Sequence, residues 1–337
     1  MELTNKCFGR CFNTLKEGEP ELLNSFFRSF DYQGASYSFL ANFIWRTDYA
    51  VGWDVVNGYL MIGRVYEDEE GRQGVISMPL TRTGSYDPVS LRDAINEMRC
   101  RMRAVGAAMD LVGVSGHMLP ILEEAFGGKV DARHERDLDE YVYEKQKLIT
   151  LSGRALHKKK NHLNYFLKTY TYEARPLTRD DLEDILRLTD TVRAEHDRTE
   201  EQLLSLAQEK RAIRMMIDFI GDPGIYTVGV FIDGEMQAYA IGEMLSEDTA
   251  VEHFEKANLK YRGLYQAVCS EFCKALPDTC LYVNREEDMG LENLRHAKQA
   301  LRPHHMAEKY ICTLTDQVEL EGICAGEGER AGELAAC

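Results

Sequence analysis

The amino-acid sequence predicts an α+β protein built from two similar domains in tandem. At 337 residues the chain is long enough for about two domains, each with its own core. Each half carries a turn signal between two apolar runs, Asn57-Gly58 in the first and Asp233-Gly234 in the second, and each signal predicts a β-hairpin. In both halves the hairpin is followed by a strand, a helix, a strand, a helix and a strand. This repeated order indicates a duplicated architecture.

The first half alternates short apolar runs with one long amphipathic segment. Leu91, Ile95, Met98 and Met102 follow one another at spacings of three or four residues, which predicts a helix over 88–105. The other apolar runs of this half are too short to form long helices. The expected strands are 50–56, 59–66, 74–80, 109–115 and 139–148, and a short helix is expected at 120–126.

The second half begins with a mostly helical region. Ser152 is a candidate N-cap, and Thr178 with Asp181 forms a weak capping-box pattern at the start of another helix. The expected helices are 151–170, 180–192, 202–220, 263–276 and 291–301. The expected strands are 225–232, 236–245, 249–258, 280–286 and 309–314.

These elements place one domain at residues 1–145 and a second at residues 146–314. The segment 315–337 holds six acidic residues and several Gly and Ala residues, with no apolar periodicity. Such a composition cannot bury enough apolar surface to fold, so we expect an acidic, disordered tail.

Composition and charge exclude several classes of protein. With 40 Lys and Arg against 56 Asp and Glu, the formal net charge is −16, which disfavours broad nonspecific binding of nucleic acid but leaves room for a local basic site. No run of about 18 apolar residues and no signal-peptide pattern is present, so we expect a cytoplasmic protein. The nine cysteines are scattered without a C-x-x-C pair, and we expect reduced thiols.

A first candidate site lies on the predicted helix at 151–170. Residues 154–168 contain five Lys or Arg and no acid, in a chain that is otherwise acidic. One helical face collects donors suited to phosphate oxygens. These residues are His157, Lys160, Asn161, Asn164 and Lys168. The alternative interpretation is an ordinary solvated face.

A second candidate site is the strand, loop and helix start over residues 251–268. Strict alternation places His253 and Glu255 on one face of the strand and Phe254 and Lys256 on the other. Glu255 is then a candidate general base with His253 as its partner. The alternative is an ordinary ion pair in an edge strand.

A third candidate site is the polar cluster that follows the strand at 280–286. Ligand-binding groups often lie where a strand ends. The cluster consists of Asn284, Arg285, Glu286 and Asp288, with Arg295 and Lys298 on the following helix. The alternative is surface salt bridging. Cys269 and Cys273 form at most half of a metal site without a matching pair, so no metal is expected.

The segment around Arg262 resembles the pyrophosphate-binding turn of GNAT acetyltransferases, whose pattern is R/Q-x-x-G-x-G/A. Arg262 and Ala267 match that pattern, but Tyr265 stands at the central glycine position, where its side chain would obstruct the backbone approach of coenzyme A. The resemblance therefore implies the fold, and acetyl-CoA is disfavoured. No cofactor is expected.

A resemblance to one family covers most of the chain. The sequence is similar to the phosphatidylglycerol lysyltransferase C-terminal domain family in four segments, which are 37–46, 151–166, 252–267 and 282–303. This resemblance implies two tandem GNAT-like α+β domains, with mixed, mostly antiparallel sheets flanked by helices. It also implies aminoacyl transfer from a charged tRNA to an acceptor, without coenzyme A or a metal. A lipid headgroup, a peptide or a small amine are the acceptors considered.

The resemblance also suggests roles for individual residues. Glu255, His253 and Asp288 are the expected catalytic residues, and Lys158, Lys160, Asn161 and Asn164 are expected to contact phosphates or the tRNA 3′ end. His157 is an expected substrate contact. Arg262 is expected to bind an anion at the helix start. Expected further substrate contacts are Lys256, Asn284, Arg285, Glu286, Arg295 and Lys298. Two other functions stay open. One is an acyltransferase that uses acyl-CoA or another activated acyl donor, and the other is a noncatalytic protein that binds an anionic lipid headgroup or peptide.

Overall fold

Both predicted hairpins form in the structure, a computed structural model that describes residues 11–18, 20–29, 34–69, 71–193 and 200–315. Asn57 and Gly58 have φ values of 50° and 85°, and Asp233 and Gly234 have values of 53° and 80°. Two successive positive φ values are typical of the tight turn that matches the twist of paired strands. Apart from residue 315, the expected acidic tail lies outside the described residues.

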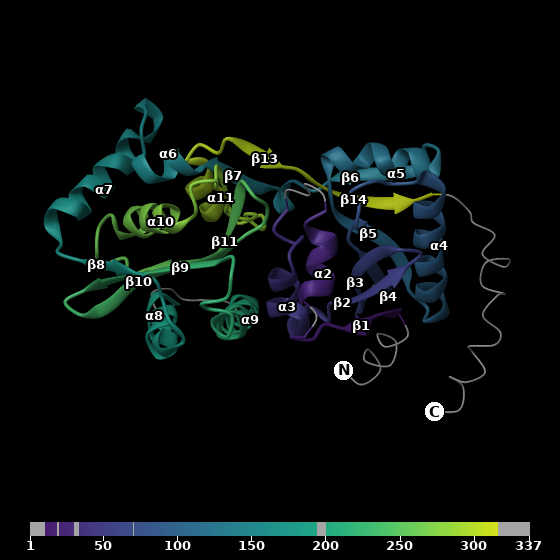
Figure 1. Cartoon of the computed structure of the whole chain (residues 1–337), viewed down its shortest axis with the longest axis horizontal. Coiled ribbons are helices and arrows are strands. Elements are labelled where there is room, and N and C mark those ends of the chain that lie inside the picture. The colour runs from purple at the N-terminus through teal and green to yellow at the C-terminus, as the bar shows by residue number, and fades with distance from the viewer. Residues whose placement is uncertain (1–10, 19, 30–33, 70, 194–199, 316–337) are drawn as a thin grey trace. The chain divides into compact units, whose positions relative to one another are not determined.

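The chain forms two compact units, each with its own seven-stranded sheet (Figure 1). The first unit consists of the described residues of Met1–Tyr32, Arg46–Glu135 and Glu308–Cys337. The second consists of those of Gln33–Trp45 and Arg136–Ala307. None of the helices in the described ranges is long and apolar enough to cross a bilayer.

In the first unit the sheet is antiparallel except for the parallel pair β4 and β5. Its strands, in spatial order, are β1 (Asn13–Thr14), β2 (Gly52–Val56), β3 (Tyr59–Asp68), β4 (Gly71–Ile76), β5 (Ala108–Ser115), β14 (Lys309–Leu314) and β6 (Val130–His134). The helices are α2 (Pro20–Phe27), α4 (Pro88–Ala104) and α5 (Leu119–Phe126). Asp87 caps α4 by accepting a hydrogen bond from Ser90 N, as expected for a helix that begins at a proline.

In the second unit the sheet is antiparallel except for the parallel pair β11 and β12. Its strands, in spatial order, are β13 (His305–Ala307), β7 (Glu140–Glu144), β12 (Tyr282–Asn284), β11 (Thr249–Ala257), β10 (Glu235–Met244), β9 (Ile225–Ile232) and β8 (Glu173–Arg175). The helices are α6 (Lys145–Thr150), α7 (His157–Thr169), α8 (Leu182–Arg193), α9 (Glu200–Ile217), α10 (Leu264–Ala275) and α11 (Glu292–Gln299).

Helices cover both faces of the second sheet (Figure 1). The core on one face includes Phe166 of α7 and Phe272 of α10. The core on the other face includes Ile185 of α8, Ile213 of α9 and Ile44 of α3 (Phe39–Tyr49). Side chains within β11 therefore lie between two helical layers, where charged groups such as Glu252 are removed from water.

Two strands join a different sheet from the one the predicted division at residue 146 implies. Strand β7, expected in the N-terminal domain, pairs with β12 and β13 of the second unit. Strand β14, expected in the C-terminal domain, pairs with β5 and β6 of the first unit. Each sheet thus takes a strand from the other half of the sequence, because pairing depends on contacts that no local pattern encodes.

Most predicted elements are present, with a few local differences. Helix α7 begins at His157 after a short 3₁₀ turn, and no side chain caps it, so Ser152 is not its N-cap. The capping box of Thr178 and Asp181 forms as predicted. The run at 139–148 divides into β7 and α6. Strand β6 and helices α2 and α3 were not anticipated from the sequence.

Candidate active site

The candidate site lies where β11 and β12 diverge. The two strands pair for only three residues, from Thr249 opposite Tyr282 to Val251 opposite Asn284. Strand β12 then ends, while β11 continues to Ala257. Beyond Val251 and Asn284 no backbone hydrogen bonds join the two strands, so side chains lie between them.

A β-bulge in β11 decides which side chains face this space. Phe254 lies opposite Ile241 and Glu252 lies opposite Gly242, so His253 is the extra residue. A Cβ at Gly242 would lie 2.0 Å from Val251 O, so only glycine fits beside the bulge. Glu252 and Glu255 consequently approach Cys269 of α10.

The alternation expected from sequence, with His253 and Glu255 on one face, is therefore wrong. His253 contacts Glu243 of β10 and Glu286 of the loop after β12. Glu255 contacts Arg285. One inserted residue changes the face on which the following side chains lie.

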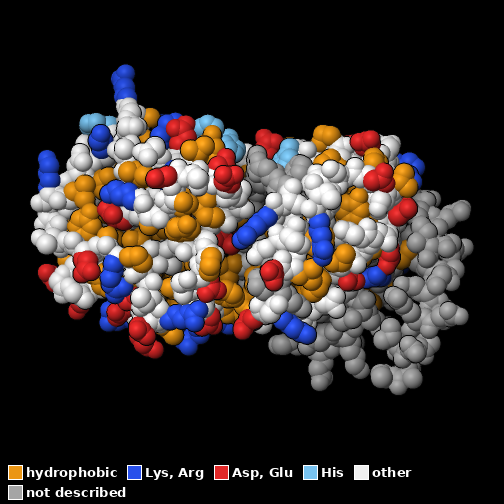
Figure 2. Space-filling view, in the orientation of Figure 1, with side chains coloured by type: hydrophobic (Ala, Val, Ile, Leu, Met, Phe, Trp, Pro, Cys, Tyr) orange, Lys and Arg blue, Asp and Glu red, His pale blue; other side chains and the backbone are white. Residues whose placement is uncertain are grey.

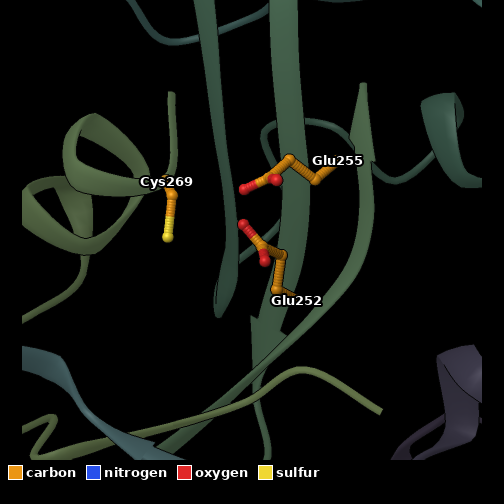
Figure 3. Close-up of side chains that lie close together, drawn as sticks. All are labelled: Glu252, Glu255 and Cys269. Carbon is orange, nitrogen blue, oxygen red and sulfur yellow. The ribbon is translucent and has the colours of Figure 1, made fainter. Parts of the chain in front are cut away.

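Glu252, Glu255 and Arg285 form a buried ion cluster between β11 and α10. Figure 3 shows the carboxylates of Glu252 and Glu255 turned toward one another, with the thiol of Cys269 beside them. Arg285 donates through Nε to Glu252 and through Nη2 to Glu255 Oε1, the second contact at 2.8 Å. The side chains of the three charged residues are 2%, 11% and 14% exposed, in that order. The guanidinium thus holds two carboxylates side by side in the interior.

Burial raises the pKa of Glu255 well above its usual value, and the charge of Glu252 adds to that effect, while Arg285 opposes it. Glu252 Oε1 and Glu255 Oε2 have no hydrogen-bond donor among the described residues. Glu255 is accordingly a buried carboxyl group able to take up and release a proton.

The cluster also contains the donor atoms of a possible metal site. One ligand atom from each of Glu252, Glu255 and Cys269 lies within 4.8 Å of the others. Arg285, however, already holds one oxygen of each carboxylate. The guanidinium therefore already supplies a positive charge to this donor set.

The turn before α10 is closed by α7. Gly263 has a φ of +89°, and a Cβ there would lie 2.1 Å from His162 O. The side chain of Tyr265 is half-buried next to Glu255, and burial raises the pKa of its phenol to about 12. The residues of this turn therefore do not fit a coenzyme A pyrophosphate, which would need open backbone at the same place.

Gly263→Ala should lower the free energy of unfolding by about 3–4 kcal/mol, because a left-handed φ and a clash with α7 act together. Gly234→Ala is the matched control: its φ is +80° and nothing lies within 4 Å of the added Cβ. We expect that control to lose only about 1–2 kcal/mol. Urea denaturation of both variants measures the difference, and equal losses would mean that α7 does not press on this turn.

His253 lies between two carboxylates. Its Nε2 is 3.0 Å from Glu243 Oε1 and its Nδ1 is 2.7 Å from Glu286 Oε1. Ser38 Oγ donates to the same Glu243 oxygen at 2.6 Å. Burial alone would lower the pKa of His253, but the two carboxylates outweigh it and raise the pKa to about 10. The imidazole is therefore a fixed cation near neutral pH.

Asp288 anchors the loop after β12. It is fully buried, accepts 2.9 and 2.8 Å hydrogen bonds from Arg295 Nε and Nη2, and accepts one from Tyr141 at 2.5 Å. The hydrogen bonds from Arg295 lower the pKa of Asp288 well below its usual value. Lys298 donates to the carbonyl groups of residues 285, 286 and 287. These contacts hold the loop in place and leave Asp288 ionised and fully engaged.

The sequence of residues 27–313 matches the family described as phosphatidylglycerol lysyltransferase, C-terminal. This match covers most of the chain. The chain belongs to that family. The two mixed, mostly antiparallel sheets flanked by helices confirm the predicted fold class, two tandem GNAT-like domains.

Three proteins are similar to this member of the lysyltransferase family over different shares of the chain. An uncharacterised protein, MYCGA3080, of Mycoplasmoides gallisepticum is 27% identical over 188 residues, which are 54% of this chain and 58% of that protein. A conserved protein of unknown function from Bacteroides thetaiotaomicron has 25% identity and a TM-score of 0.79, covering 90% of this chain and 99% of the other. L-PGS from Bacillus licheniformis has 11% identity and a TM-score of 0.61, covering 93% and 96%.

In this family member the structure brings residues of the second and third candidate sites together. Glu255 meets Arg285, His253 meets Glu286, and Asp288 meets Arg295. Asn284 is buried and donates to Glu140 Oε2 at 2.6 Å. Lys256 lies outside these clusters and pairs with Glu209 of α9 at 2.6 Å.

The predicted contacts on α7 are exposed and separate from the ion cluster. His157, Lys158, Lys160, Asn161 and Asn164 all lie on the solvent side of the helix. Asn161 Nδ2 is 3.4 Å from His157 Nδ1. Arg262, also exposed, lies over the ring of Tyr165 of the same helix at 4.9 Å.

Three carboxylates of the clusters were missed from the sequence: Glu252, Glu243 and Glu140. Each interrupts or borders an apolar strand, as in the run from Ala250 to Phe254. A charged residue within a strand that is buried on both faces needs a partner. The sequence therefore indicated that each of these glutamates needs a partner, but it did not indicate which residue that partner is.

Proposed function

We propose that the protein transfers an aminoacyl group from aminoacyl-tRNA to an amine or hydroxyl acceptor, with Glu255 as the general base. The observation that carries the proposal is the buried Glu255 carboxyl group. It has a raised pKa and an oxygen without a donor, and it lies where β11 and β12 diverge. A carboxyl group with a raised pKa is matched to proton transfer nearer neutral pH. Membership of the lysyltransferase family supports this choice of reaction.

In the proposed reaction the acceptor nucleophile attacks the ester carbonyl carbon of the aminoacyl group. A bond forms between the acceptor nitrogen or oxygen and that carbon, and the ester bond to the tRNA ribose breaks. Glu255 takes the proton from the acceptor and returns it to the departing ribose hydroxyl, so the protein ends in its starting state. Arg285 holds Glu255 in position beside Glu252.

The other expected residues take different places in this proposal. Asn284 and Glu286 shape the acceptor pocket, and Lys158, Lys160, Asn161, Asn164 and Arg262 contact the tRNA end. His253 and Asp288 become positioning residues, because their ring nitrogens and carboxylate oxygens are already bonded to neighbours. The closed turn at Gly263 and Tyr265 argues against an acyl-CoA donor.

Purified protein should transfer a radiolabelled aminoacyl group from aminoacyl-tRNA to one member of an acceptor panel. The panel contains phosphatidylglycerol vesicles, a peptide and a small amine. Glu255→Gln should reduce the rate by about 100-fold, because an amide cannot accept the proton. Because Glu255 must lose its proton to act, the wild-type rate should also rise with pH through its raised pKa.

Glu292→Gln is the matched control, since Glu292 is exposed on α11 and takes no part in the cluster. It should keep the wild-type rate. Transfer from acetyl-CoA in place of aminoacyl-tRNA would contradict the proposal in favour of an ordinary acyltransferase. Ligand binding without turnover of any donor would favour a noncatalytic binding protein.

A further inference from the structure

The cations of residues 154–168, in and just before α7, lack the acidic partners that many cations of the second unit have. No ion pair links Arg154, Lys158, Lys159, Lys160 or Lys168 to a residue within the described ranges. By contrast, ten other cations of this unit have such partners. They are Arg136, Lys147, Arg175, Arg179, Arg187, Lys210, Lys256, Lys274, Arg285 and Arg295. The surface over α7 accordingly shows Lys, Arg and His side chains in Figure 2.

An exposed aromatic ring lies among these cations. Tyr165 of α7 is 40% exposed, and the Arg262 guanidinium lies over its ring at 4.9 Å from the centroid. Tyr165 contacts Tyr170 edge to face at 6.4 Å, and Tyr170 contacts Tyr261 in the same manner at 5.2 Å. Packing behind Tyr165 therefore supports its ring, while part of the ring and the planar guanidinium remain open to solvent.

Gly263 sets the position of Arg262 relative to Tyr165. Arg262 precedes Gly263, where an added Cβ would lie 2.1 Å from His162 O of α7. The guanidinium thus reaches Tyr165 from a backbone held against the same helix. Packing of the turn against α7 therefore positions Arg262 relative to Tyr165.

We propose that Tyr165 and Arg262, flanked by the cations of α7, form a stacking platform for the unpaired nucleotides at the 3′ end of an RNA. Aromatic rings and guanidinium planes stack on unpaired bases, while lysines neutralise the adjacent phosphates. The net charge of −16 repels a long duplex, so the basic surface suits a short single-stranded segment. The identification of this RNA with the donor tRNA rests on the proposed function.

The position of the platform suits delivery of an aminoacyl ester to Glu255. Arg262 is three residues from Tyr265, whose phenol lies close enough to Glu255 for the carboxylate to raise its pKa. A strand end held at Tyr165 and Arg262 would thus lie on the turn that also carries Tyr265. The platform binds the nucleotides, and the cluster acts on the ester that they carry.

The test compares an uncharged RNA minihelix with a single-stranded 3′ tail against the same minihelix with a blunt end, by fluorescence anisotropy. Because neither RNA is aminoacylated, turnover plays no part. The tailed RNA should bind about tenfold more tightly, and Tyr165→Ala should remove that difference without weakening the blunt RNA. Tyr165→Phe should keep it. Arg262→Ala should weaken binding of the tailed RNA, while Lys160→Ala should reduce the salt dependence by about one phosphate contact.

Leu167→Ala is the matched control, because Leu167 is 46% exposed on the same helix but lies away from the Arg262 pair. RNA binding should not change in this variant. Equal affinity for tailed and blunt RNA, or equal loss of both in Tyr165→Ala, would overturn the platform. Tighter binding to phosphatidylglycerol vesicles than to RNA, lost in Leu167→Ala, would also overturn it and assign the surface to a membrane.

Different results would overturn the proposed aminoacyl transfer and the proposed RNA platform. Tail-dependent RNA binding without transfer of any aminoacyl group would support the platform and overturn the proposed function. Transfer that proceeds while Tyr165→Ala binds tailed RNA as the wild type does would support the proposed function and overturn the platform.

Discussion

Replacement of Arg285 by methionine should lower the free energy of unfolding by about 3–5 kcal/mol, a large part of the stability of a typical domain. The guanidinium contacts both Glu252 and Glu255 in the interior. Methionine fills a similar volume but leaves Glu252, whose side chain is 2% exposed, without this cation. Breaking a buried ion set by removing one member is costly because the remaining charge is not solvated. Urea denaturation at pH 7 measures the change.

Arg133→Met provides the matched control for this prediction. The Arg133 side chain is 67% exposed and pairs with Glu135 at 2.9 Å, so its loss should change stability by less than about 1 kcal/mol. Adding Glu252→Gln to Arg285→Met should restore part of the lost stability, since a neutral amide then replaces the buried charge. If Arg285→Met is as stable as the Arg133→Met control, the two carboxylates do not depend on Arg285.

His253 should make the protein less stable as pH rises from 6 to 10, by about 3–5 kcal/mol. Its pKa moves from 6.5 to about 10 because Glu243 and Glu286 outweigh the opposing effect of burial. Below pH 6.5 the imidazole is protonated in both the folded and the unfolded chain, and the stabilisation is complete. Between 6.5 and 10 the unfolded chain releases the proton while the folded chain retains it, so the stabilisation declines. Above 10 it is lost.

Comparison with His253→Asn isolates this effect, because the other titrating groups are common to both proteins. The difference in unfolding free energy between wild type and variant should be large at pH 6 and small at pH 10, as measured by urea denaturation. His296→Asn is the control, since that side chain is exposed on α11. A wild-type advantage that is the same at both pH values would show that His253 is not held as a cation.

Most of the secondary structure could be predicted because its signals are local. The hairpin turns at Asn57-Gly58 and Asp233-Gly234, the apolar spacing of α4 and the capping box of Thr178 are each contained within a few residues. Strand β6 is only five residues long, with Val130 and Ala132 as its apolar residues, and its place in the sheet depends on pairing with β14. A propensity pattern cannot report such a pairing.

The candidate site could be predicted only as a set of residues. Arg285, Glu286 and Asp288 were recognised as a polar cluster at a strand end, yet they take part in three different groups of contacts. The bulge at His253 redirects its side chain away from Glu255, and it depends on the register with Gly242. The partner carboxylates Glu243 and Glu252 lie on strands whose apolar runs gave no indication of which cation they would meet.

The sequence by itself determined the order of helices and strands, the turn types and the family, because backbone preferences and apolar periodicity act over a few residues. Only the tertiary structure decided that β7 and β14 join the sheets of opposite units. It also decided that Glu252 and Glu255 share Arg285, and that Arg262 lies on Tyr165. These contacts join residues from separate elements, and their strength depends on burial, which exists only once the chain has folded.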